Sequence, residues 1–168
     1  YREGLILQNE KRWEEAGNCF WRAIELGPTF VDAYSSLAFG YGKVGKNDEA
    51  VTYYSKAIDL EPKNADLYYQ RALIRGKMGE STKAMSDFSS VVELDPKNFT
   101  AWMNRGLARK AMGDYEAAIS DLHEAMLLSP DTPTLYYHLG LAYRKIKNYT
   151  KAVENLEDFV KRAPTHPL

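Results

Sequence analysis

The chain has little cysteine, almost no net charge and no long apolar run. Its one cysteine, Cys19, excludes an intrachain disulfide framework and a zinc site built from cysteines. No apolar run approaches the roughly 18 residues of a membrane-spanning helix, and the first residues do not resemble a signal peptide. Lys+Arg 22 against Asp+Glu 23 give a formal net charge of −1, without the broad attraction expected of a nucleic-acid or membrane-surface protein. These absences favour a soluble, cytoplasmic protein.

Residue patterns for catalysis or cofactor binding are also missing from the 168 residues. His123, His138 and His166 do not have the spacing of metal ligands, either with one another or with Cys19. No glycine-rich phosphate loop is present, since the glycines from 40 to 45 lie where a helix is expected to end. We therefore predict no enzyme activity, no metal and no cofactor.

A period of 34 residues is the strongest pattern in the sequence. It relates the five prolines Pro28, Pro62, Pro96, Pro130 and Pro164. It also relates Ala16, Ala50, Ala84, Ala118 and Ala152, and the aromatic residues Tyr34, Tyr68, Trp102 and Tyr136. A fixed period between about 20 and 50 residues is typical of a solenoid or an array of repeats.

Within each period the apolar residues have helical spacing, and they form two separate stripes. In the unit 99–132, Gly113 and Asp114 divide the stripes, because glycine ends helices and aspartate starts them. The spacing predicts helices near 1–10, 14–26, 31–43, 48–60, 65–77, 82–94, 99–111, 116–128, 133–145 and 150–162.

These columns resemble the tetratricopeptide repeat. In the unit 31–64 the pattern is carried by Tyr34, Ala38, Tyr41, Gly45, Ala50, Tyr54, Ala57, Leu60 and Pro62. The resemblance implies an all-α, right-handed superhelical solenoid of antiparallel helix pairs. The units would be a truncated repeat at 1–30 and full repeats at 31–64, 65–98, 99–132 and 133–166. Arg71 with Asp87, and Arg105 with Asp121, occur together in the units 65–98 and 99–132, which predicts an ion pair between the helices of each. The alternative is that the members are independent surface charges.

The resemblance also implies that the first helix of each unit lines a concave groove. The expected floor is Leu5, Phe39, Leu73, Leu107 and Leu141, with Tyr69, Met103, Asn104, Tyr137 and His138 beside it. The expected positive border is Lys43, Lys77, Lys110 and Arg144. Exposed apolar rows mark interaction sites. We therefore predict a protein–protein interaction scaffold or adaptor, whose groove binds a peptide or helix with apolar anchors and acidic flanks.

Two other functions remain open. Single-stranded RNA could stack its bases on Tyr69 and Tyr137, although the net charge of −1 does not favour this. Self-assembly through the ends of the array is the second. Phe159 stands where earlier units have small residues, so it is expected to stop further stacking and to make an end contact, unless the ring folds over its own unit. Trp21 is the equivalent candidate near the other end.

Overall fold

The computed structural model describes residues 1–163, which form ten α-helices and no strand. The helices are α1 (Arg2–Asn9), α2 (Trp13–Leu26), α3 (Val31–Lys43), α4 (Asn47–Leu60), α5 (Ala65–Lys77), α6 (Ser81–Leu94), α7 (Phe99–Ala111), α8 (Tyr115–Leu128), α9 (Pro133–Lys145) and α10 (Tyr149–Arg162). No bound differs from the predicted one by more than one residue. The prediction of an all-α repeat solenoid is confirmed.

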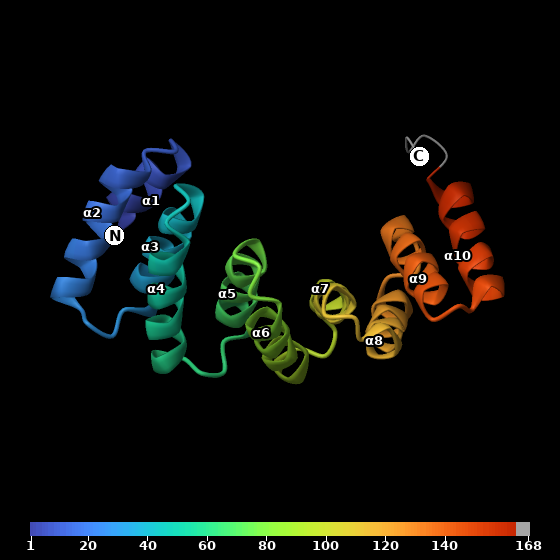
Figure 1. Cartoon of the computed structure of the whole chain (residues 1–168). Helices are drawn as coiled ribbons and strands as arrows, with labels where there is room; N and C mark the ends of the chain where they lie inside the picture. Colours follow the sequence, from blue (N-terminus) through green and yellow to red (C-terminus); the bar gives the residue numbers. More distant parts are fainter. Residues whose placement is uncertain (164–168) are drawn as a thin grey trace. The chain divides into compact units, whose positions relative to one another are not determined.

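The helices divide between two compact parts of the chain, Tyr1–Glu80 and Ser81–Leu168. We call these parts unit 1 and unit 2, and each is larger than one repeat. Unit 1 contains α1 to α5, and the described part of unit 2 contains α6 to α10 (Figure 1). Within each unit, consecutive helices pack against each other, and the first helices α3 and α5, or α7 and α9, also touch. The boundary between the units falls inside the predicted repeat 65–98.

The turn inside each repeat has a residue with left-handed backbone conformation. In the three inner repeats this residue is glycine, with φ of +81° at Gly45, +77° at Gly79 and +87° at Gly113. The outer repeats have Lys11 at φ 60° and Lys147 at φ 62° in the same column. Glycine adopts this conformation without steric cost, so the glycine column of the sequence reports the geometry of the turn.

Small residues bring the two helices of a repeat close together. A Cβ atom added to Gly140 in α9 would lie 2.7 Å from Cγ of Leu156 in α10. In α7, a Cβ on Gly106 would lie 3.2 Å from the carbonyl oxygen of Ala118. Both distances are shorter than an ordinary van der Waals contact, so a larger residue at Gly140 or Gly106 requires the facing atoms to shift.

The aromatic column of the first helices secures the turn that precedes each helix. Its side chains donate hydrogen bonds from Tyr68 to the carbonyl oxygen of Pro62 at 3.1 Å, from Trp102 to that of Pro96 at 2.9 Å, and from Tyr136 to that of Pro130 at 2.9 Å. The two most regular columns of the sequence therefore meet in one recurring contact.

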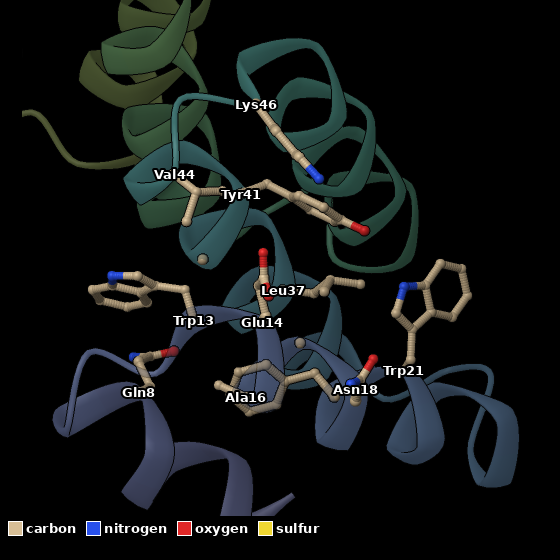
Figure 2. A pocket seen from close by; sticks show the side chains of 13 residues that line it. Gln8, Trp13, Glu14, Ala16, Asn18, Trp21, Leu37, Tyr41, Val44 and Lys46 are labelled. Carbon is tan, nitrogen blue, oxygen red and sulfur yellow. The ribbon is translucent and has the colours of Figure 1, made fainter.

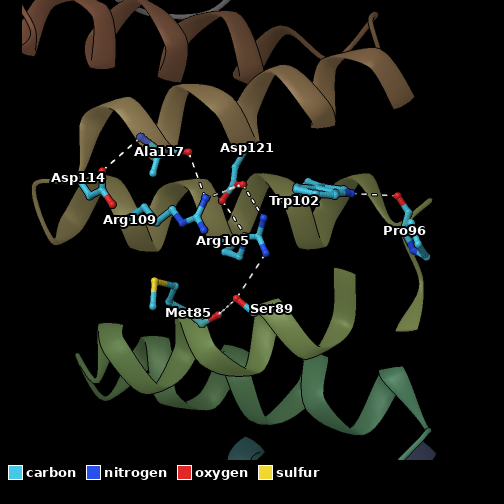
Figure 3. A network of polar contacts seen from close by, with 9 residues as sticks. All are labelled: Met85, Ser89, Pro96, Trp102, Arg105, Arg109, Asp114, Ala117 and Asp121. Atoms are coloured by element: carbon cyan, nitrogen blue, oxygen red, sulfur yellow. Dashed lines mark hydrogen bonds and ion pairs between the residues drawn. The ribbon is translucent and has the colours of Figure 1, made fainter. Parts of the chain in front are cut away.

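A buried ion cluster joins α7 to α8 in unit 2 (Figure 3). Asp121 is 2% exposed and accepts hydrogen bonds from Nε and Nη2 of Arg105, at 2.9 and 2.7 Å. Arg109 adds a second cation, with Nη1 2.8 Å from Asp121 Oδ1. The predicted Arg105–Asp121 pair is confirmed, whereas the sequence did not reveal the part played by Arg109.

The other predicted pair, Arg71 with Asp87, has one member in each unit and stays a prediction. In the repeat 31–64, Tyr41 and Tyr53 occupy the positions equivalent to Arg109 and Asp121. Their rings stack with centroids 5.5 Å apart. Equivalent positions of the repeat therefore form an ion pair in unit 2 and an aromatic stack in unit 1.

Asp121→Ala should lower the free energy of unfolding by about 3–5 kcal/mol, because it leaves two partly buried guanidinium groups without their shared acceptor. Chemical denaturation followed by circular dichroism measures this loss. The double variant Arg105→Met with Asp121→Leu should lose less than Asp121→Ala alone, since it removes one guanidinium group together with the carboxylate and leaves only Arg109 without its acceptor.

Glu15→Ala is the matched control, because Arg12 also donates two hydrogen bonds to the Glu15 carboxylate, from Nε at 2.7 Å and from Nη2 at 2.6 Å. This pair lies on the surface, with side chains 50% and 56% exposed, so its loss should leave stability nearly unchanged. Equal losses for Asp121→Ala and Glu15→Ala would show that burial does not set the strength of the cluster.

Candidate functional site

The five residues predicted to form the groove floor lie on the first helices, one per repeat, and all are half-buried. Leu5, Phe39 and Leu73 belong to unit 1, and Leu107 and Leu141 to unit 2. Half-burial leaves part of each apolar side chain in contact with solvent. The row is thus available as a contact surface within each unit.

In unit 1 this row borders a cavity of about 330 Å³ between α1, α3 and α5. Phe39 and Leu67 supply its apolar wall, and Ser35, Ser36 and Gln70 supply hydroxyl and amide groups. Asp32 and Asp66 lie at its margin, and its described lining contains no lysine. First-turn carboxylates and last-turn lysines give α3 and α5 an acidic and a basic end, so the lysines expected at the border lie at one end of these helices.

Lys43 and Lys77 are exposed at the last turns of α3 and α5. The Lys43 ammonium lies over the ring of Phe39, 4.7 Å from its centroid. A cation at this distance is attracted by the ring face. The basic end of the unit 1 groove is therefore in contact with its apolar floor.

In unit 2 the corresponding side chains come from α7 and α9. Lys110 is half-buried, and its Nζ lies 3.1 Å from Nδ1 of His138. Burial lowers the pKa of Lys110, and burial followed by repulsion from Lys110 lowers the pKa of His138 to about 4. The neutral imidazole then accepts a hydrogen bond from the ammonium. Lys110 is therefore partnered, while Arg144, in the last turn of α9, is exposed.

The remaining groove residues, Tyr69, Met103, Asn104 and Tyr137, are also half-buried on their first helices. The ring of Tyr137 packs against that of Phe159 in α10, with centroids 5.3 Å apart. This contact reduces the ring surface that Tyr137 offers to a ligand.

The structure corrects the expectation for Phe159. The residue is only 3% exposed and its ring lies inside its own repeat, as in the alternative given with that expectation. The exposed apolar side chains of α10 are instead Tyr149, Val153 and Val160. Trp21, the other predicted end contact, is 39% exposed and packs edge-on against Tyr53.

A second cavity, of about 530 Å³, lies in unit 1 between α1, α2 and α3 (Figure 2). Trp13, Glu14 and Trp21 line one side of it, and Tyr41 and Lys46 line the other. No expectation from the sequence included this cavity. Its signal in the sequence is a departure from the repeat at Gly17 and Gly40, which are the only glycines in their columns.

None of the helices in residues 1–163 is long and apolar enough to cross a membrane. Within the same residues, no group of three His, Cys, Asp or Glu side chains could hold a metal ion.

Two family models match the sequence. One, described as TPR repeat, matches residues 41–79 and 106–147. The other, described as tetratricopeptide repeat, matches residues 65–98 and 133–166. Neither is the model of an enzyme family. The chain belongs to the tetratricopeptide repeat family, as its columns indicated.

No curated protein sequence matches the chain. Among solved structures, MamA superimposes with a TM-score of 0.91 at 19% identity, over 96% of this chain and 94% of that one. A MamA fragment from Desulfovibrio magneticus RS-1 gives 0.91 at 18% identity, over 99% and 94%. YrrB, described as a TPR protein with an unusual peptide-binding site, gives 0.88 at 23% identity, over 97% and 84%. At these identities the structures share the fold.

The low pKa of His138 predicts a pH-dependent stability. The unfolded chain, with an ordinary histidine pKa of 6.5, binds more protons than the folded chain down to about pH 4. The stabilising contribution is therefore complete above pH 6.5 and is lost as the pH falls towards 4. We expect a lower free energy of unfolding at pH 5 than at pH 7, and a smaller difference in His138→Gln.

His123→Gln is the comparison variant, because burial and then Lys151 lower the pKa of His123 in the same direction. It should remove a smaller part of the pH dependence. Denaturant titrations at both pH values measure the effect, and an unchanged difference in His138→Gln would contradict it.

Proposed function

We propose that the chain is a protein-interaction scaffold that binds a peptide or helix from a partner protein along its first helices. The half-buried apolar row, together with the cavity at Phe39, is the observation that carries this proposal. A groove of this kind accepts alternate apolar side chains of an extended segment, or the anchors of an amphipathic helix. The description of YrrB as peptide-binding supports the same ligand class.

Charge in unit 1 favours one orientation of the bound segment. Asp32 and Asp66 lie at one end of the first helices, and Lys43 and Lys77 lie at the other. A segment with a basic residue near the aspartates and an acidic residue near the lysines complements both ends. Such complementarity mainly sets specificity and the rate of association.

Single-stranded RNA is the alternative with weaker support. Tyr137 packs against Phe159, the unit 1 cavity has carboxylates at its margin, and Lys110 is bonded to His138. Each of these features reduces stacking surface or positive charge, which RNA binding needs. Self-assembly through exposed residues of α10 stays a prediction that no described contact tests.

Leu73→Glu combined with Leu107→Glu tests the groove, because it places a carboxylate on the floor of each unit. Peptides selected from a random phage-displayed library against the wild-type chain serve as ligands. We expect the double variant to bind them at least about tenfold more weakly, since apolar contact is replaced by a charge that must be desolvated. Fluorescence anisotropy measures affinity, and circular dichroism verifies unchanged helicity.

Leu26→Glu combined with Leu127→Glu is the matched control. These leucines are 84% and 77% exposed on the second helices α2 and α8, one in each unit. The control should bind the selected peptides like the wild type. Full binding by the groove variant would move the site off the first helices, and salt-sensitive binding of oligouridine without peptide binding would favour the RNA alternative.

A further inference from the structure

The 530 Å³ cavity of unit 1 exists because two side chains of the repeat are missing there. Gly17 occupies the column that has Val51, Met85, Ile119 and Val153 in the later repeats. Gly40 occupies the column that has Ile74, Ala108 and Ala142. Val51 and Ile74 pack in one hydrophobic cluster, and Ile119 and Ala142 in another.

Both glycines line the cavity, and neither is there to permit a close approach. A Cβ on Gly40 would meet no atom within 4 Å, and one on Gly17 would make only an ordinary contact, 3.7 Å from Leu37. The first repeat interface is thus left open where the others are filled. Its volume lies within the range of about 300–1,000 Å³ that is usual for ligand sites.

Two acceptor groups that line the cavity have no partner among the described residues. Oε1 of Gln8 is buried and has no hydrogen-bond partner among the described residues. The Glu14 carboxylate has no ion-pair partner among residues 1–163, and in Figure 2 it points to the middle of the cavity. An unsatisfied buried acceptor is costly, so Gln8 Oε1 favours a ligand that donates a hydrogen bond. The Glu14 carboxylate is exposed and adds a negative charge that favours a cationic donor.

Two indoles stand on either side of Glu14. Trp13 is held edge-on by Phe39, with ring centroids 6.0 Å apart, and Trp21 by Tyr53, at 5.5 Å. Figure 2 shows Trp13 above Gln8 at one end of the cavity and Trp21 at the other. Indole faces attract cations, and the planar guanidinium group of arginine stacks on them.

We propose that this cavity binds an arginine side chain of a partner polypeptide. The guanidinium group donates to the Glu14 carboxylate and to Gln8 Oε1, and it stacks on an indole. Its five N–H donors match these acceptors better than the single ammonium of lysine. That the arginine belongs to a polypeptide rests on the proposed function.

Lys46 makes it possible to distinguish a cationic ligand from an anionic one. Its ammonium lies over the ring of Tyr41, 5.9 Å from the centroid, on the other side of the cavity from Glu14. A cationic ligand is repelled by Lys46, whereas an anionic ligand would need it. Lys46→Ala should therefore leave the affinity for arginine unchanged or raise it.

Indole N–H signals in the ¹⁵N NMR spectrum provide the readout, because the chain has three tryptophans. The probe is acetyl-Ala-Arg-Ala-amide, compared with its lysine and citrulline counterparts and with free arginine. We expect the signals of Trp13 and Trp21 to shift with the arginine tripeptide and to shift less with the others. Trp102, bonded to Pro96 in unit 2, should not move.

Three variants test whether the tripeptide binds in this cavity. Glu14→Gln should lower the affinity for the arginine tripeptide by about fivefold, because a charge-assisted hydrogen bond is lost. Asp48→Asn, at the equivalent position of the next repeat, should have no effect. Gly17→Val with Gly40→Ile restores the side chains of the later repeats and should abolish binding. The chain should stay folded, because a Cβ atom at either glycine makes no close contact and both positions line the cavity that the longer side chains would fill.

Four outcomes would overturn the proposal: no shift of Trp13 and Trp21, equal binding of the citrulline tripeptide, retained binding in the filled variant, or loss of binding in Lys46→Ala. Equal affinity for free arginine would overturn the assignment to a partner polypeptide. The groove variant Leu73→Glu with Leu107→Glu should retain the tripeptide shifts. Failure of the arginine pocket is therefore distinguishable from failure of the concave groove.

Discussion

The close approach of the two helices within each repeat is the constraint on which the rest of the structure depends. At Gly140 and Gly106 an added Cβ atom would lie closer to the partner helix than an ordinary contact allows, and the partner helices supply the side chains that fill the gap. Neither helix can bury its apolar face alone, so stability comes from stacking along the array. The left-handed turn residue of each repeat and the bond from an aromatic side chain to the proline carbonyl keep that spacing constant.

A constant backbone allows side-chain chemistry to vary at equivalent positions. Asp121 and its two arginines occupy, in unit 2, the place where Tyr41 stacks on Tyr53 in unit 1. The columns of Gly17 and Gly40 are filled in later repeats and open at the interface between the first two repeats. These substitutions leave the helix bounds unchanged, because they alter what lies between helices and not how the helices begin or end. The distinctive surface of the first repeats arises in this way.

The groove and the 530 Å³ cavity of unit 1 are neighbours, since Gln8 lines both cavities and Trp13 touches Phe39. Asp32 and Asp66 at one cavity and Glu14 at the other make this surface acceptor-rich and partly aromatic. Both proposals therefore call for a partner segment with apolar anchors and basic residues. Unit 2 differs, because Lys110 and His138 satisfy each other and Phe159 covers part of Tyr137.

The sequence by itself determined the helices, the turns and the half-buried row, because these depend on spacing along one helix or within one 34-residue period. It also predicted the Arg105–Asp121 pair, since both members fall in one repeat. It left open whether Phe159 makes an end contact or folds over its own repeat, and it did not predict the Lys110–His138 bond or the cavity at Gly17 and Gly40. These depend on how far apart side chains from two or three helices lie in space, which a periodic pattern does not specify. Only the tertiary structure decided which bulky residue turns inward, and where a missing side chain leaves an open cavity.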